Sequence, residues 1–257
     1  MKKVHAVTAC IIVLFVILLS FVLTSLNMAP ETEEVRALGK FFLENSYFGD
    51  YSAMSPEVVT SILWDYRGLD TIYETSVFFL AIISSLALFR LGNTIESEKH
   101  SEDSGPGLSF IVKGIVKLVS VMIIAVSASI ALHGHLTPGG GFQGGSALAV
   151  VPLLVIVAFS KFALEDLGFT KDRAMVVRSL SLVGIALVAL FPLLYGAYIM
   201  QNQPIFPARI GGQLTSGSLI LYNIFEYFAV GAGFTAVFLL LATPEKIFKK
   251  LLGVKKE

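Results

Sequence analysis

The segment HGHLTPGGGFQGG, residues 133–145, restricts the fold of this chain more than any other feature. It contains no aspartate, glutamate, lysine or arginine, and it lies between two apolar runs, residues 111–132 and 146–162. Its glycines free the backbone for unusual angles and close approaches, and Pro138 ends the incoming helix. Backbone groups left open in this way cannot face lipid. The segment is therefore expected to be buried in protein, to line a wet cavity, or to lie at the membrane surface.

The apolar runs determine the class of protein. Of the 257 residues, 55% are hydrophobic and only 15% are charged, whereas about 25% are charged in soluble domains. A run of about twenty apolar residues can cross a bilayer as a helix. The sequence predicts an all-α polytopic membrane protein with about six transmembrane helices. They are expected near residues 6–26, 71–91, 111–132, 146–162, 175–200 and 218–242.

The first run and the loops define the topology. The first run exceeds the about 7–15 apolar residues of a signal peptide, which favours a retained helix over a cleaved leader. Residues 35–42 have helical apolar spacing, and either a surface helix or a solvated connector fits them. An N-in/C-in arrangement in the cytoplasmic membrane places most basic residues inside. These are Lys2, Lys3, Arg90, Lys99, Lys161, Lys171, Arg173, Arg178 and the lysines of the tail.

The glycine-rich segment resembles the signature of the MrpB (MnhB) family, whose members are small membrane subunits of multisubunit Na+/H+ antiporters. Related subunits occur in archaeal membrane-bound hydrogenases and sulfur reductases. The resemblance spans residues 108–243 and implies a four-helix domain there. It implies Na+ and H+ as transported ions and no cofactor in this chain. The implied partners are lipids and the other membrane subunits of an Mrp-like, complex-I-related assembly.

The resemblance also assigns the residues of the motif. Pro138 and Phe142 are expected to shape the loop together with Gly139, Gly140 and Gly141, and Gln143 to offer its amide group to a cavity.

A second resemblance lies in residues 64–75, WDYRGLDTIYET. The pattern formed by Asp65, Arg67, Asp70 and Glu74 is similar to a segment near the carboxyl end of the MrpA antiporter subunit. It is also similar to a small separate subunit of archaeal membrane-bound hydrogenases. Together the two resemblances imply a fusion of neighbouring subunits. Its parts are a two-helix segment at 1–91, a cytoplasmic linker at 92–107, the domain at 108–243 and a basic cytoplasmic tail at 244–257.

Charged side chains inside the membrane need a partner, water or a function, because each costs about 2.5–3.5 kcal/mol or more there. Asp70 and Glu74 share a helical face and repel each other, which favours binding of a cation. Arg67 is the nearest counter-charge. A simple acidic helix cap also fits these residues. The resemblance favours a role in the cation or proton path.

Two further charges lie deeper in the predicted spans. Glu226 is eight residues into the last helix, about 12 Å from its start. It is either an ionic contact of functional importance or a satisfied structural carboxyl. Lys117 is about 6 Å further along its helix than Lys113. Both lysines either extend to the membrane surface or modulate neighbouring protonation.

Several kinds of chemistry are not expected. His133 and His135 are two residues apart with no third ligand nearby in sequence, so we expect them to tie the loop to neighbouring helices and predict no metal site. Cys10 is the only cysteine, and no phosphate-binding loop, dinucleotide fingerprint or nucleophile elbow occurs. Catalytic residues are therefore not expected, and the zero net charge gives no sign of nucleic-acid binding.

These features predict a non-catalytic membrane subunit of an Mrp-type Na+/H+ antiporter module. The module would belong to an energy-converting respiratory complex, a sulfane sulfur reductase or a hydrogenase. The alternatives are a structural subunit of the membrane arm and a subunit of a free-standing Mrp antiporter. A self-contained transporter is less favoured, because the sequence has no clear internal repeat and few mid-membrane charges.

Overall fold

The computed structural model describes residues 2–26, 35–49, 52–88 and 108–243. Within these residues six helices are long and apolar enough to cross a membrane, which confirms the predicted all-α multi-pass class. They are α1 (Lys2–Ser25), α4 (Gly68–Leu88), α5 (Phe110–Leu132), α6 (Gly141–Ala158), α8 (Lys171–Leu190) and α9 (Ser218–Leu241).

Shorter elements connect the long helices. The helix α2 (Ala37–Asn45) overlaps residues 35–42, for which a surface helix and a solvated connector were both considered. Next come α3 (Val58–Ser61) and a π-helix, η1 (Ile62–Tyr66). The helix α7 (Lys161–Asp166) precedes α8, which continues into the 3-10 helix η3 (Phe191–Tyr195). A two-stranded antiparallel hairpin, β1 (Arg209–Ile210) and β2 (Gln213–Leu214), precedes α9.

The chain forms two compact units, residues 1–41 and 42–257. The sequence places the boundary elsewhere, because it groups residues 1–91 as one segment and joins them to the rest through 92–107. The helix α4 instead belongs to the larger unit, since it packs against α9 and buries Thr71 and Ile82. The predicted linker and the predicted tail at 244–257 lie outside the described residues.

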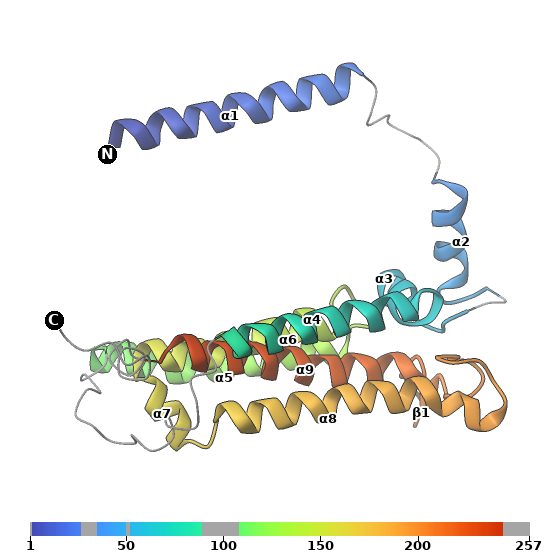
Figure 1. The fold of residues 1–257 in the computed structure, drawn as a ribbon. Coiled ribbons are helices and arrows are strands. Elements are labelled where there is room, and N and C mark those ends of the chain that lie inside the picture. Colours follow the sequence, from blue (N-terminus) through green and yellow to red (C-terminus); the bar gives the residue numbers. More distant parts are fainter. Residues whose placement is uncertain (1, 27–34, 50–51, 89–107, 244–257) are drawn as a thin grey trace. The chain divides into compact units, whose positions relative to one another are not determined.

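In the larger unit, α9 is the central helix. It packs against α4, α6 and α8, and α5 packs against α6 (Figure 1). Fourteen residues of α9 are buried, which explains why apolar side chains surround its whole circumference. Trp64 of η1 stacks on Tyr222 of α9 with ring centroids 4.5 Å apart, and both rings belong to a buried apolar cluster. This stack fixes η1 against the first turns of α9.

The glycine-rich segment is partly helical, unlike the prediction. The helix α6 begins at Gly141, five residues before the predicted start. The reason is packing: a Cβ at Gly145 would lie 2.6 Å from the carbonyl oxygen of Tyr227 in α9, and one at Gly144 would lie 2.7 Å from that of Ser127 in α5. Small residues let membrane helices approach this closely. The glycines therefore serve as helix contacts as well as loop residues.

Three connecting segments meet at one end of the larger unit, which we call the loop end. Ser55 Oγ donates to the carbonyl oxygen of His135 at 2.6 Å, and Ser216 Oγ donates to that of Met54 at 2.7 Å. Asn202 Nδ2 donates to the carbonyl oxygen of Ala53 at 3.3 Å. These bonds join residues 52–61, 133–140 and 196–217, so the glycine-rich loop is held from both sides.

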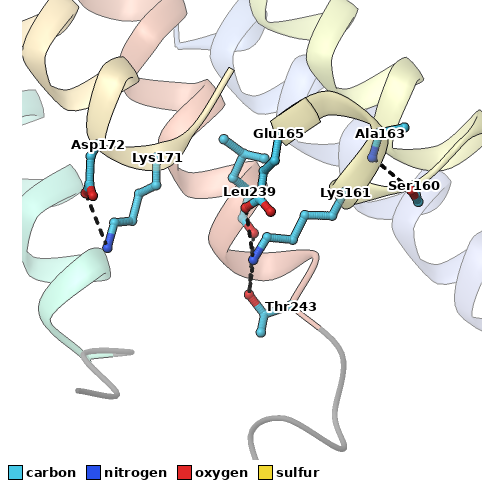
Figure 2. A network of polar contacts seen from close by, with 8 residues as sticks. All are labelled: Ser160, Lys161, Ala163, Glu165, Lys171, Asp172, Leu239 and Thr243. Carbon is cyan, nitrogen blue, oxygen red and sulfur yellow. Dashed lines mark hydrogen bonds and ion pairs between the residues drawn. The ribbon is translucent and has the colours of Figure 1, made fainter. Parts of the chain in front are cut away.

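The opposite end of the unit, which we call the connector end, is fixed by Lys161 (Figure 2). Its Nζ donates to Thr243 Oγ1 at 3.1 Å, just after α9, and lies 3.5 Å from a carboxylate oxygen of Glu165. Lys171 lies 3.6 Å from Asp172 at the start of α8. The contacts of Lys161 hold α7 against the end of α9, and Lys161 and Lys171 both lie at the connector end.

Candidate functional site

A cavity of about 280 Å³ lies between α4, α9 and the beginning of α6, near the loop end. Two carboxylates and several uncharged oxygens face it. Its lining residues are Thr60, Leu63, Trp64, Thr71, Glu74, Thr75, Phe78, Gly139, Gly140, Phe142, Gln143, Asn223, Glu226 and Val230. The cavity therefore joins the two sequence motifs, residues 64–75 and 133–145.

Glu226 anchors the cavity to the glycine-rich segment. It is only 7% exposed, and its Oε2 accepts a hydrogen bond of 3.0 Å from the backbone N–H of Phe142. One turn earlier, Asn223 Oδ1 accepts from the N–H of Gly141 at 3.3 Å. Both N–H groups belong to the first turn of α6, where the helix leaves donors free and favours negative charge. The start of α6 thus holds a carboxylate from α9.

The local sequence makes this contact possible. Gly140 has φ +144° and ψ −177°, a conformation that side chains rarely adopt, and it turns the chain into α6. A Cβ at Gly141 would lie 2.5 Å from the carbonyl oxygen of Asn223 and 2.7 Å from Glu226 Oε2. Only glycine allows the backbone of α6 to reach the two polar side chains of α9.

Glu74 supplies the second carboxylate of the cavity, from α4. It interacts electrostatically with Glu226, and two carboxylates facing one cavity repel each other. Asp70 is on the same helix but has a different environment. Its Oδ2 accepts from Arg67 Nε at 2.7 Å, and both side chains are exposed. The expected acidic pair is therefore divided: Asp70 is paired with Arg67, and Glu74 faces the cavity.

Three threonine hydroxyls of the cavity are oriented as acceptors. Thr60 Oγ1 donates to the carbonyl oxygen of Gly134 at 2.5 Å, Thr71 Oγ1 to that of Leu63 at 2.5 Å, and Thr75 Oγ1 to that of Ile72 at 2.9 Å. A hydroxyl has a single proton to donate. The remaining lone pairs of these oxygens can therefore accept a proton donor or coordinate a cation in the cavity.

The sequence reasoning did not identify these threonines. A signal was present, because Thr71, Glu74, Thr75 and Phe78 follow one another at i, i+3, i+4 and i+7 on one face of α4.

The histidines of the motif differ in their contacts. His135 is 2% exposed, and its Nε2 lies 2.9 Å from the carbonyl oxygen of Leu214 in β2. Burial lowers the pKa of His135, which favours the neutral ring. This contact joins the loop to the hairpin before α9, whereas the sequence analysis expected a tie to a neighbouring helix. His133 Nδ1 instead lies 2.9 Å from the carbonyl oxygen of Ser129, one turn back in α5, so this ring makes no such tie there.

Other candidate residues lie outside the cavity lining. Asp65 is half-buried in η1, and burial raises its pKa to about 6. Lys117 is exposed on α5, and its Nζ lies 5.8 Å from the centroid of the Phe159 ring, which Lys113 also approaches at 5.6 Å. Pro138 is exposed in the loop. These residues are brought neither to Glu74 nor to Glu226.

Arg178 was counted among the basic residues on the cytoplasmic side, near the start of the span expected at 175–200. In the structure α8 begins at Lys171, so Arg178 lies about two turns inside the helix, and it is only 1% exposed.

Comparison with known protein families identifies the part of the chain that carries the glycine-rich segment. The model of the MnhB family, described as a domain related to the MnhB subunit of Na+/H+ antiporter, matches residues 111–236. We call these residues the MnhB-related domain, after the family that they resemble. The domain supplies Glu226 and the start of α6, whereas Glu74 comes from the preceding helix α4.

Relatives cover different shares of the chain. A Methanocaldococcus jannaschii protein is 28% identical over 214 residues, which are 76% of this chain and 80% of that protein. A Staphylococcus aureus protein named as an antiporter subunit, mnhB2, is 25% identical over 134 residues, 51% of this chain and 93% of its own length. The first match is longer than the MnhB-related domain, so similarity extends beyond it.

Two solved structures share the fold. One chain of the membrane-bound sulfane sulfur reductase, an archaeal respiratory membrane complex, superposes with a TM-score of 0.68 at 24% identity. The match covers 92% of this chain and 98% of that one. A chain of the Mrp complex from Dietzia sp. DQ12-45-1b gives a TM-score of 0.65 at 15% identity, covering 93% of this chain and 26% of that one. Both matches therefore cover far more of this chain than residues 111–236.

Proposed function

We propose that this chain is a non-catalytic membrane subunit of an Mrp-type Na+/H+ antiporter module, and that its cavity forms part of the cation path. The observation that supports this most directly is the meeting of Glu74 and Glu226 in one cavity with the start of α6. The MnhB-related domain and the fold shared with two multisubunit membrane complexes support the type of assembly.

The chemistry of the cavity suits a cation that is bound and released. Hard cations prefer oxygen ligands, and the cavity offers two carboxylates and three acceptor hydroxyls. Among the described residues no three His, Cys, Asp or Glu side chains converge on one point. Two carboxylates with weaker neutral ligands favour exchange with protons or Na+ over permanent retention of a metal. We therefore assign Na+ and H+ as the ions.

The exposed surface indicates that other subunits or lipid cover the chain. Apolar side chains are exposed along α5 and α8, among them Ile115, Leu118, Leu180 and Leu187. Glu74 is also exposed in the chain by itself, although it lines the cavity. An exposed carboxylate within a membrane span needs a wet or polar neighbour. We propose that a further membrane subunit completes the cavity on the side of Glu74.

The fold match supports an energy-converting respiratory complex, a sulfane sulfur reductase or hydrogenase, as the parent assembly. Electron transfer in other subunits would drive ion movement. We place the chain in the cytoplasmic membrane with both termini inside. The lysines of the connector end then face the cytoplasm, and the loop end faces outward.

The test compares Glu226→Gln and Glu74→Gln with a matched control, Asp70→Asn. The control removes a carboxylate from the same helix, but one that is exposed, paired with Arg67 and outside the cavity. An exposed pair contributes only about 0–1 kcal/mol, so the control should fold normally. Uptake of radiolabelled Na+ is measured in proteoliposomes that contain the purified parent complex.

We expect at least a tenfold loss of energised Na+ uptake for both glutamine variants, with subunit composition unchanged on a native gel. Asp70→Asn should stay within twofold of wild type. Normal uptake by both glutamine variants would contradict the cation path and favour a structural subunit. Loss of assembly in both would also favour the structural role. Coupled transport by the purified chain alone would favour a self-contained transporter.

A further inference from the structure

The cavity ends at an aromatic group formed around Phe78. Phe78 and Val230 are the lining residues of α4 and α9 that lie furthest from the loop end. The ring of Phe78 meets Phe142 at a centroid distance of 5.8 Å and Phe234 at 5.2 Å, both edge-on. These rings come from α4, α6 and α9. Together they close the side of the cavity that faces the connector end.

Arg178 lies directly behind this aromatic group. Its guanidinium carbon is 5.7 Å from the centroid of Phe78 and 4.6 Å from that of Phe79. Its Cδ would be 3.4 Å from a Cβ at Gly233, about one turn of α9 beyond Val230. The side chain of Arg178 therefore projects from α8 into the space between α4 and α9, on the connector side of the cavity.

The environment of this guanidinium is unusual. Arg178 is 1% exposed, and neither Nη1 nor Nη2 has a hydrogen-bond partner among the described residues. No carboxylate forms an ion pair with it within the same residues. The faces of Phe78 and Phe79 attract the cation, but two ring contacts offset only part of the cost of burying it. A purely structural role would be served better by an apolar side chain.

A fixed positive charge at this place has a clear electrostatic effect. The guanidinium stays protonated in proteins, and a low effective dielectric strengthens its repulsion of other cations. A cation attracted by Glu74 and Glu226 that continued toward the connector end would have to pass the ring of Phe78 and then Arg178. The aromatic ring obstructs the route sterically and the arginine opposes the charge.

We propose that Phe78 and Arg178 form a cation barrier that closes the connector end of the cavity. Cations then exchange with Glu74 and Glu226 from the loop end or through the side where Glu74 is exposed, and they do not cross this chain between α4, α8 and α9. This inference rests on the proposed cation path, and it identifies the step at which the path must leave this subunit.

The experiment measures passive leak of radiolabelled Na+ from proteoliposomes containing the parent complex, with no substrate and no ion gradient other than Na+. Arg178→Gln removes the charge and retains hydrogen-bonding groups, and Arg178→Lys retains the charge. Phe78→Ala removes the ring. The matched control is Arg173→Gln, because Arg173 is exposed in the first turn of the same helix and its side chain bonds only to the carbonyl oxygen of Gly168 in the described structure.

We expect Na+ leak to rise ten- to hundredfold in Arg178→Gln. A unit charge about 6 Å away at an effective dielectric of about 20 opposes a cation by about that factor. Phe78→Ala should also leak, whereas Arg178→Lys and Arg173→Gln should remain near wild type. Chloride leak, measured in parallel, should stay unchanged in every variant. A rise in both ions would indicate damaged packing and overturn the proposal.

Two further outcomes are decisive. If Arg178→Gln fails to assemble, Phe78→Ala decides: selective Na+ leak supports the barrier, and no leak overturns it. The leak assay is also independent of the coupled-uptake assay. If Glu226→Gln impairs uptake but Arg178→Gln and Phe78→Ala do not leak, the barrier is wrong and the cation path stands. If the glutamate variants transport normally while Arg178→Gln leaks selectively, the proposed path is wrong and the barrier stands.

Discussion

The contact between Gly141 and α9 can be tested by adding a single methyl group. In Gly141→Ala the new Cβ would lie 2.5–2.7 Å from three atoms, the carbonyl oxygen of Asn223 and Cβ and Oε2 of Glu226. Ordinary van der Waals contacts begin near 3.4 Å, so α6 must withdraw from α9 until these distances grow from 2.5–2.7 Å to 3.4 Å, a shift of 0.7–0.9 Å. The 3.0 Å bond from the Phe142 N–H to Glu226 then lengthens to about 3.8 Å, beyond hydrogen-bonding distance.

The free-energy change follows from these two effects. Overpacking costs about 1–3 kcal/mol, and loss of a hydrogen bond to a charged group costs about 1.5–3 kcal/mol. Their sum, about 2.5–6 kcal/mol, lowers Tm by at least about 5 °C, since a chain of this size loses about 2–4 °C per kcal/mol. The measurement is thermal unfolding of the purified full chain in detergent, followed by circular dichroism at a helical wavelength.

The matched control for this experiment is Gly114→Ala. Gly114 is exposed in α5, and a Cβ there would meet no heavy atom within 4 Å. Alanine is the better helix former by about 1 kcal/mol in a helix interior, so the Tm of this variant should be unchanged or slightly higher. If Gly141→Ala melted within 1 °C of wild type, as this control should, the close contact between α6 and α9 would be refuted.

Three further predictions concern the loop end and the adjacent core. Burial raises the pKa of Asp65 from 3.8 to about 6, so ionisation of this carboxyl destabilises the folded chain, and the free energy of unfolding should fall as pH rises from about 4 to 6. Asp65→Asn should remove this pH dependence and should be up to about 3 kcal/mol more stable than wild type at pH 7. Urea titrations at several pH values would detect both effects. Asn202→Ala should lower the free energy of unfolding by about 2–4 kcal/mol, because the buried amide accepts from the N–H of Ser218 at 2.9 Å and donates to two carbonyl oxygens. A denaturation midpoint equal to that of wild type would contradict this prediction. Tyr222→Phe should leave the free energy of unfolding unchanged or raise it by up to about 1 kcal/mol, because the buried hydroxyl has no hydrogen-bond partner among the described residues. A decrease of more than about 1 kcal/mol would reveal that the hydroxyl donates to a bound acceptor.

Sequence reasoning succeeded where a property is local. The apolar runs predicted six spans because length and hydropathy are read within one helix. The depth of Glu226 followed from counting along α9, which begins at Ser218 as expected. The Arg67–Asp70 pair was also predictable, since residues three apart on a helix are neighbours. In each case the partner groups lie within one turn or one segment.

The misses involve contacts between distant segments. Glu226 accepts from a residue 84 positions away, and nothing in α9 by itself indicates the start of α6 as its partner. The glycines were interpreted as loop residues that permit close approaches, but which helices they contact, α5 and α9, is decided only when the helices pack. Arg178 was counted only as a basic residue of the cytoplasmic side, and its burial against Phe78 and Phe79 of α4 could not be inferred from α8 alone.

The cavity depends on parts of the chain that the family comparison separates. Residues 111–236 contain Glu226, the glycine-rich segment and Arg178, but Glu74 and Phe78 come from α4, before the matched region. An MnhB-related domain without such a helix would have one carboxylate at this place and no aromatic closure behind it. The match to the sulfane sulfur reductase chain covers 92% of this chain, which is far more than residues 111–236. The attached α4 is therefore an integral part of the proposed ion site, because it supplies both the second acid and the ring that separates the cavity from Arg178.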